Sequence, residues 1–185
     1  MDLSEEKELV ERARRDPDAF GKLYDQYYSQ IFGYALKRVA NVEIAEDITS
    51  EVFFKALKNL GKFRWRKISF SFWLYRIATN QITDYFRKNK RRMFSLEEIS
   101  DPVSVSNPLI ETEVLQAEEE LKRYEDFLIL HESIAKLPVK YQEAITLRYF
   151  ESKPIKEVAE ILGRREGTIK SWLHRGLEKL RKLME

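Results

Sequence analysis

The chain has 185 residues, of which 43% are hydrophobic and 12% aromatic, enough for one medium or two small packed domains. It contains no cysteine, which excludes disulfides and cysteine-ligated zinc and fits a reducing compartment. No apolar run approaches the ~18 residues needed to span a bilayer, and the charged, acidic N-terminus is unlike a signal peptide. We therefore expect a cytoplasmic protein that does not insert into membranes.

The net charge of +2 conceals three segments of opposite sign. Residues 61–92 contain ten Lys or Arg against one acid, Asp84, and residues 153–185 contain nine against five Glu. Between them, residues 93–120 contain eight acids and no base. Basic segments concentrate near polyanions and release counterions on binding. Two basic segments flanking an acidic one therefore favour nucleic acid as a partner.

Helical spacing of apolar residues dominates the first half of the chain. It predicts amphipathic helices over 18–39, over 43–60 with an end at Gly61, and over 70–90. No alternating strand pattern is present, so we expect an all-α fold. The predicted first domain covers residues 1–92.

Residues 93–126 break the helical pattern and predict a flexible acidic linker, with a further helix possible from about residue 109. Fully extended, such a linker reaches ~110 Å, which exceeds two turns of duplex at ~34 Å each. A second domain is predicted over 127–185, with helices at 127–136 and 138–150 separated at Pro138. Ser152 is the expected N-cap of the next helix, ahead of Pro154.

The second domain contains the spacing of a helix-turn-helix. This motif needs a small residue where its helices cross, a turn residue that tolerates positive φ four positions later, and a buried apolar residue six positions beyond. Ala159, Gly163 and Ile169 satisfy these conditions. The opposite face of the second helix would then offer polar side chains to a major groove. The candidates are Arg165, Thr168, Lys170, Ser171, His174 and Arg175. The alternative is an ordinary helical hairpin with a solvated charged face.

Residues 61–92 interleave aromatic rings with cations, as in surfaces that bind unpaired strands, where rings stack on bases and cations follow phosphates. On the predicted helix from Phe70, Leu74, Ala78, Ile82 and Tyr85 form an apolar stripe, and a separate face is polar. The candidates for strand binding are Phe63, Arg64, Trp65, Arg66, Lys67, Trp73, Arg76, Asn80 and Arg87. Alternatively, Phe72 and Trp73 are core residues, and the basic run 87–92 is a solvated helix end.

Three segments in order, AEDITSEVFFKAL (45–57), FWLYRIATNQITDYFRKNKRR (72–92) and GTIKSWLHRGLEKL (167–180), resemble bacterial sigma factors of the extracytoplasmic-function type. The resemblance implies a factor that binds core RNA polymerase, recognises the minus-thirty-five and minus-ten promoter elements and assists strand opening. It places core polymerase binding on Asp47, Glu51 and Phe54. It assigns the residues around 63–87 to the minus-ten element and the 165–175 face to the minus-thirty-five element.

The resemblance also implies promoter DNA as a partner, an association with the nucleoid, and an anti-sigma factor as a candidate inhibitor. Where the family usually has Gln and Arg, this chain has Ser50 and Trp172, and Trp172 is interpreted as a packing residue. We expect no catalytic residue, metal or cofactor, since neither histidine has neighbouring ligands and no phosphate loop is present. The competing interpretations are a free-standing helix-turn-helix regulator and a helical protein bound to membrane surfaces.

Overall fold

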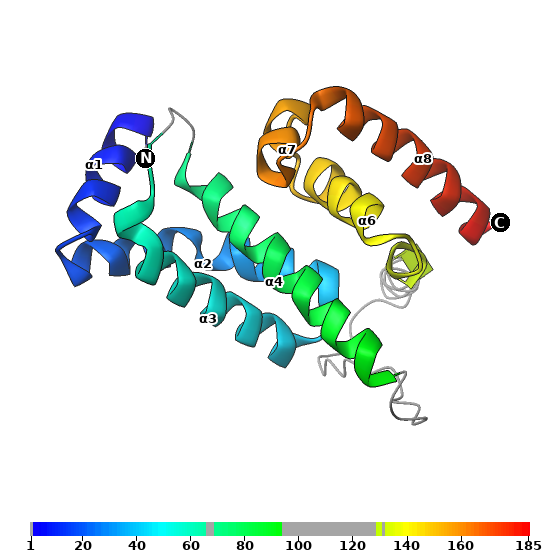
Figure 1. The fold of residues 1–185 in the computed structure, drawn as a ribbon, viewed down its shortest axis with the longest axis horizontal. Helices are drawn as coiled ribbons and strands as arrows, with labels where there is room; N and C mark the ends of the chain where they lie inside the picture. Colours follow the sequence, from blue (N-terminus) through cyan, green and yellow to red (C-terminus); the bar gives the residue numbers. More distant parts are fainter. Residues whose placement is uncertain (1, 66–68, 94–128, 131) are drawn as a thin grey trace, which may run out of the picture.

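The computed structural model describes residues 2–65, 69–93, 129–130 and 132–185, with side chains up to residue 89 in the second range. Its elements form two helical domains connected in sequence through residues outside these ranges (Figure 1). The first domain contains α1 (Leu3–Ala13), α2 (Pro17–Val39), α3 (Val42–Asn59), the 3-10 turn η1 (Leu60–Lys62) and α4 (Phe70–Met93). The second contains α6 (Val139–Ile145), the π-helical turn η2 (Thr146–Phe150), α7 (Ile155–Leu162) and α8 (Glu166–Met184). The described residues include no strand, as the all-α prediction requires.

Local signals in the sequence set the starts of the first three helices. Asp2 caps α1 through a capping box with Glu5, and Asp16 caps α2 ahead of a proline at the first helical position. The side chain of Asn41 accepts a hydrogen bond from the Ile44 N–H and begins α3. These caps satisfy backbone donors that have no partner inside the helix.

The core of the first domain is formed by the inner faces of α2, α3 and α4. Tyr34, Ile31, Leu74 and Ile82 are fully buried there, and the Tyr34 hydroxyl shares a 2.9 Å hydrogen bond with Thr79. The predicted apolar stripe of α4 is therefore a core face, except that Tyr85 is only half-buried. α4 lies along the boundary with the second domain, where it contacts α7 (Figure 1).

Three details of the sequence prediction need correction. Ser152 does not cap α7: it lies in a turn with a φ of 52°, and Pro154 holds the N-cap position without a side-chain hydrogen bond. Gly61 does not end α3: the α-helix ends at Asn59, and Gly61 lies inside the 3-10 turn η1 that follows it. α1 was not predicted at all, although the capping box of Asp2 and Glu5 marks its start.

The predicted helices at 18–39, 70–90 and 138–150 correspond to α2, to α4 and to α6 with η2. Of the predicted helix 127–136, the described residues 129–130 and 132–135 are helical, and the predicted linker lies outside the described residues from position 94 to 126. Within the described ranges, no helix is long and apolar enough to cross a membrane.

Candidate nucleic-acid interface

α7 and α8 form a helix-turn-helix whose geometry matches the predicted spacing. Ala159 is buried where the helices cross, Gly163 ends α7 in the left-handed region with a φ of 62°, and Ile169 is fully buried. Gly176 allows α8 to lie close to α6, because a Cβ there would be 3.0 Å from Ile145 Cδ1 and 3.1 Å from Tyr141 Cβ. Small and apolar residues therefore hold α8 by its inner face and leave its outer face free.

The outer face of α8 presents a continuous set of polar side chains. Lys170, Ser171, His174 and Arg175 are exposed, and Thr168 is half-buried at its edge. Arg165 is exposed at the N-cap position of the same helix. The residues that we name the outer face are Arg165, Thr168, Lys170, Ser171, His174 and Arg175. N-terminal residues of a recognition helix are the ones that reach base edges in helix-turn-helix proteins.

Trp172 belongs to the packed edge of α8 rather than to this outer face. It is half-buried, with the Arg164 guanidinium 5.8 Å and Lys140 Nζ 6.0 Å from its ring centroid. These distances are typical of cation–π contacts. The interpretation of Trp172 as a packing residue is consistent with these contacts.

A second surface is formed where η1 and the following loop meet α4. The Phe63 ring lies 4.9 Å from Trp73, 5.4 Å from Phe70 and 6.3 Å from Trp65, centroid to centroid. Phe63, Trp65 and Trp73 are each half-buried, so each packs through one part and exposes another. For Trp73, half-burial leaves both alternatives open, core residue and strand ligand. Phe72 is likewise half-buried, under Lys153 at 5.5 Å.

Two of these rings, Phe63 and Trp73, border a pocket of about 350 Å³ between α3 and α4. Helical spacing puts Trp73 and Asn80 on the polar face of α4, and both line this pocket together with Phe63. The pocket also has lining residues that the sequence analysis missed: Lys55, Asn59, Lys62, Ile77 and Gln81. The α3 members were missed because nothing in the local pattern of that helix says which residues of α4 it faces.

An adjoining pocket of about 260 Å³ extends toward the second domain. Arg64 and Arg76 line it on the first-domain side, and Glu160 of α7 lines it on the other. Trp65 lines neither pocket, but its ring lies beside Phe63, which lines both. We name the following residues the aromatic–basic surface: Phe63, Arg64, Trp65, Trp73, Arg76 and Asn80. Arg87 lines neither pocket and forms a 2.9 Å ion pair with Asp84. Arg66 and Lys67 lie outside the described residues.

α3 carries the third candidate surface on the side away from the core. Asp47 and Glu51 are exposed, one turn apart, and Glu51 forms a 3.3 Å ion pair with Lys55. Phe54 follows on the same face and is 58% exposed, which is unusual for a large apolar side chain on a well-packed helix. Leu57, 50% exposed, extends this apolar patch. An exposed apolar patch rimmed by charged residues is typical of a protein-binding surface.

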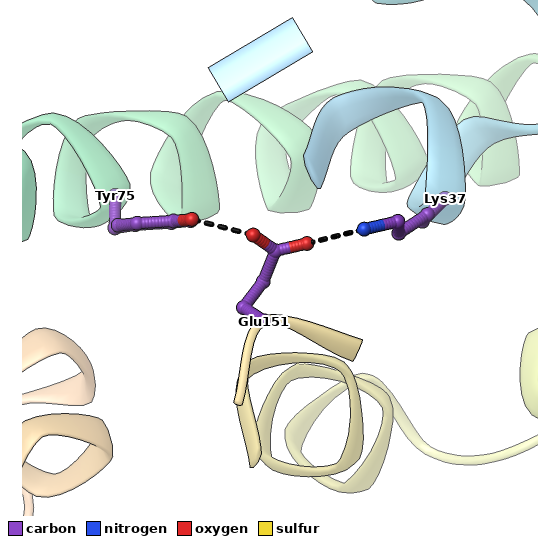
Figure 2. Close-up of polar contacts among 3 residues, drawn as sticks. All are labelled: Lys37, Tyr75 and Glu151. Carbon is purple, nitrogen blue, oxygen red and sulfur yellow. Dashed lines mark hydrogen bonds and ion pairs between the residues drawn. The ribbon is translucent and has the colours of Figure 1, made fainter. Parts of the chain in front are cut away.

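Polar contacts join the two domains (Figure 2). Glu151, which follows η2, reaches the first domain and accepts a hydrogen bond of 2.5 Å from Tyr75 on α4 and one of 2.8 Å from Lys37 on α2. Thr83 donates to Glu143 at 2.8 Å in a parallel contact between α4 and α6. These polar contacts add to apolar packing at the boundary, since the buried apolar residues of the two domains form one continuous cluster.

Burial at this boundary raises the pKa of two side chains, Tyr75 and Glu143. Burial, and then the hydrogen bond to Glu151, raise the pKa of the Tyr75 hydroxyl well above its ordinary value, so Tyr75 remains a donor at neutral pH. Burial also raises the pKa of Glu143, against the opposing effects of the Thr83 hydroxyl and Arg38. Arg38 itself is 3% exposed and donates through Nη2 to Gln142 at 3.2 Å. Its Nε and Nη1 have no partner among the described residues.

The described part of the chain contains no cluster of His, Asp or Glu that could hold a metal ion. Its candidate sites are three surfaces: the outer face of α8, the ring-lined pocket bordered by cations, and the exposed acidic and apolar face of α3.

Two family models match the chain, Sigma-70 region 2 over residues 23–92 and Sigma-70 region 4 over residues 127–180. The chain belongs to the extracytoplasmic-function sigma factors of RNA polymerase, a family that directs promoter-specific initiation of transcription. It is 34% identical to the sigma factor SigW of Bacillus subtilis over 184 residues, which are 98% of this chain and 97% of SigW. It is 35% identical to BldN of Streptomyces coelicolor over 180 residues, 96% of this chain but 65% of that longer protein.

Two solved structures share the fold. CnrH, in complex with the cytosolic domain of CnrY, matches with a TM-score of 0.68 at 21% identity, over 99% of this chain and 97% of that chain. RpoE of Bartonella quintana, in a co-crystal with the anti-sigma factor NepR, matches with a TM-score of 0.66 at 20% identity, over 89% and 96%. The arrangement of helices is thus that of known sigma factors.

Proposed function

We propose that the two domains divide promoter recognition between them. The second domain binds duplex DNA at the minus-thirty-five element through the outer face of α8. The first domain recognises the minus-ten element and holds its bases after they unstack. The observation that carries this proposal is the ring-lined pocket of about 350 Å³ with Asn80 at its wall and Lys55 and Lys62 among its lining.

The free energy of base stacking favours strand capture at the aromatic–basic surface. Stacking a base on an aromatic ring is worth ~1–3 kcal/mol, which is comparable with the cost of unstacking it from the duplex. Phe63, Trp65 and Trp73 can therefore offset local melting without a chemical energy source. Asn80 offers an amide that reads a base edge, and Arg64 and Arg76 offer guanidinium groups to phosphates.

Core RNA polymerase binds, in this proposal, to the exposed face of α3. Asp47 and Glu51 provide negative charge for a basic partner surface, and Phe54 provides an apolar contact beside them. The polymerase supplies the catalysis, and the sigma factor supplies position. Such a protein functions in the cytoplasm at the nucleoid.

The closed arrangement of the domains has to open for this function. The two promoter elements lie more than two turns of duplex apart, at ~34 Å per turn, whereas Glu151 contacts Tyr75 and Lys37 directly. Closure also places the Arg76 guanidinium 3.4 Å from the Cβ position of Gly163 in the helix-turn-helix. Opening would release Arg76 for DNA and hydrate the buried nitrogens of Arg38.

An anti-sigma factor is a candidate for controlling this step. The Bartonella quintana structure of the same fold was solved with the anti-sigma factor NepR. By analogy, a partner of that class would bind this chain while the domains are closed and would withhold both DNA surfaces.

Run-off transcription tests the proposed function. Core polymerase from a bacterium is mixed with this protein and a library of promoter templates, and core polymerase alone is the control. We expect RNA with a defined start only when the protein is present. A chain that binds duplex DNA but never produces a defined transcript with core polymerase would instead be a free-standing helix-turn-helix regulator.

A further inference from the structure

α1 lies next to the aromatic–basic surface but outside the residues that the family models match, which begin at position 23. One of its side chains, Glu6, is an acid with only 2% exposure. Charged residues are rarely buried to this degree unless several hydrogen bonds satisfy them. The partners of Glu6 therefore indicate what it does.

Glu6 accepts three hydrogen bonds on a single oxygen, Oε1. The Phe70 N–H donates at 2.8 Å, the Ser69 hydroxyl donates at 2.9 Å, and the Tyr27 hydroxyl donates as well. Phe70 is the first residue of α4, so Glu6 satisfies a backbone donor that has no partner within its own helix. A carboxylate at this position also complements the positive end of the helix dipole.

A second residue of the same segment reaches the other end of the loop. Arg14, directly after α1, donates from Nη2 to the Phe63 carbonyl at 2.7 Å. Phe63 follows η1, and Phe70 begins α4. The N-terminal segment thus binds the backbone on both sides of the connection that carries Trp65.

We propose that Glu6 and Arg14 are positioning residues for strand capture. They fix the two ends of the η1–α4 connection so that the rings of Phe63, Trp65 and Trp73 keep one arrangement before DNA arrives. Ordering a loop in advance removes that entropic cost from binding, and small displacements of positioned groups cost large factors in rate. This inference rests on the proposed function, since it assigns the connection a role in holding unpaired bases.

The test uses holoenzyme reconstituted with Glu6→Ala and with Arg14→Ala. Glu8→Gln and Arg15→Ala are matched controls, because both residues are exposed on the same segment. Three quantities are measured: affinity for a single-stranded minus-ten oligonucleotide, affinity for a minus-thirty-five duplex, and affinity of the factor for core polymerase. We expect roughly tenfold weaker single-strand binding for each variant, with the other two affinities and both controls unchanged.

Conservative variants separate positioning from general stability. Arg14→Lys retains a cationic donor, and Glu6→Gln retains an acceptor oxygen, so both should recover part of the lost single-strand affinity. If Glu6→Ala fails to fold, Arg14→Ala decides the question, because Arg14 is exposed and its loss leaves the core intact. A uniform loss of all three affinities, tracking a lower melting temperature, would overturn the positioning role.

Trp65→Ala in the same assays distinguishes the two levels of the proposal. If Trp65→Ala weakens single-strand binding while Glu6→Ala and Arg14→Ala bind as the unchanged chain does, the positioning inference is wrong and the proposed function stands. If Trp65→Ala itself binds single strands normally, the proposed function is wrong, and the positioning inference fails with it.

Discussion

The outer face of α8 and the aromatic–basic surface are both candidate DNA surfaces, but they are constructed differently. The outer face belongs to one helix, and its position depends on Ala159, Gly163 and Ile169, all within eleven residues of sequence. The aromatic–basic surface combines residues of α4 and of the chain that follows η1, and α3 forms one wall of its pocket. Hydrogen bonds with Glu6 of α1 and with Arg14 hold its backbone. The first kind of surface needs only a stable helix pair, whereas the second depends on the packing of a whole domain.

A charge reversal at Asp47 should have the largest effect, because it opposes binding of the polymerase, without which neither DNA surface leads to transcription. We expect Asp47→Arg to weaken core binding by roughly 100-fold, since like charges opposed across an interface cost several kcal/mol. Binding of the free factor to a minus-thirty-five duplex should not change. Glu46→Arg is the control, because it makes the same charge change about 100° around the helix. An unchanged dissociation constant for core polymerase would refute the assignment of α3.

The second largest expected effect is a loss of duplex binding at the outer face of α8. Lys170→Ala should weaken duplex binding by roughly tenfold, as for the loss of one good contact, and reduce the salt dependence by about one counterion if the contact is to a phosphate. Lys182→Ala, near the other end of α8, is the control. The measurement is a titration of duplex DNA at several salt concentrations. Equal losses for the two lysines would show that α8 attracts DNA without a defined register.

The sequence predicted which residues share a helix face on both surfaces, but not which residues different helices bring together. Helical spacing fixes which residues share a face, so it placed Lys170, His174 and Arg175 together, and likewise Trp73 and Asn80. It did not show that Lys55 and Gln81 lie at one pocket, because tertiary packing decides that relation. Nor did it reveal the hydrogen bonds that Ser69 and Phe70 donate to Glu6, more than sixty positions away in the sequence.

The contact between the domains was also beyond sequence reasoning. Nothing in the local pattern around Glu151 specifies Tyr75 as its partner, and the flanking Ser152 was wrongly interpreted as a helix cap. Ser152 instead adopts a positive φ and redirects the chain directly after Glu151, ahead of α7. The structure therefore shows that the two domains contact each other through Glu151 and Tyr75, which the sequence of neither domain predicts.

Glu151→Gln should shift the molecule toward the open arrangement by roughly fivefold. Hydrogen bonds to a charged group are worth about 1.5–3 kcal/mol, reduced here because Lys37 is partly exposed and screened. The measurement is fluorescence energy transfer between dyes on the two domains of the free factor. Glu166→Gln, an exposed acid at the start of α8, is the control. The same transfer efficiency in all three proteins would mean that Glu151 does not hold the domains together.

The smallest expected effect is a pH dependence of closure. Burial raises the pKa of Glu143 above its ordinary value of 4.5 in the closed arrangement, so the closed form binds this proton more tightly than an open form. Protonated Glu143 therefore stabilises the closed arrangement. This stabilisation is fully present below pH 4.5 and is lost as the pH rises through the raised pKa of Glu143. Energy transfer should therefore increase slightly as the pH is lowered toward this window. Glu143→Gln should remove that dependence, and a dependence that persists would assign it to another group.

The division between the two surfaces is tested most directly by measuring both binding steps on the same variants. Trp65→Ala, Asn80→Ala and Arg175→Ala holoenzymes are compared for affinity to a minus-thirty-five duplex and for strand opening by permanganate reactivity. The account predicts that Trp65→Ala and Asn80→Ala lose opening by about 5- to 100-fold with duplex affinity retained, and that Arg175→Ala loses duplex affinity first. Parallel losses of duplex affinity and opening in all three variants would contradict it.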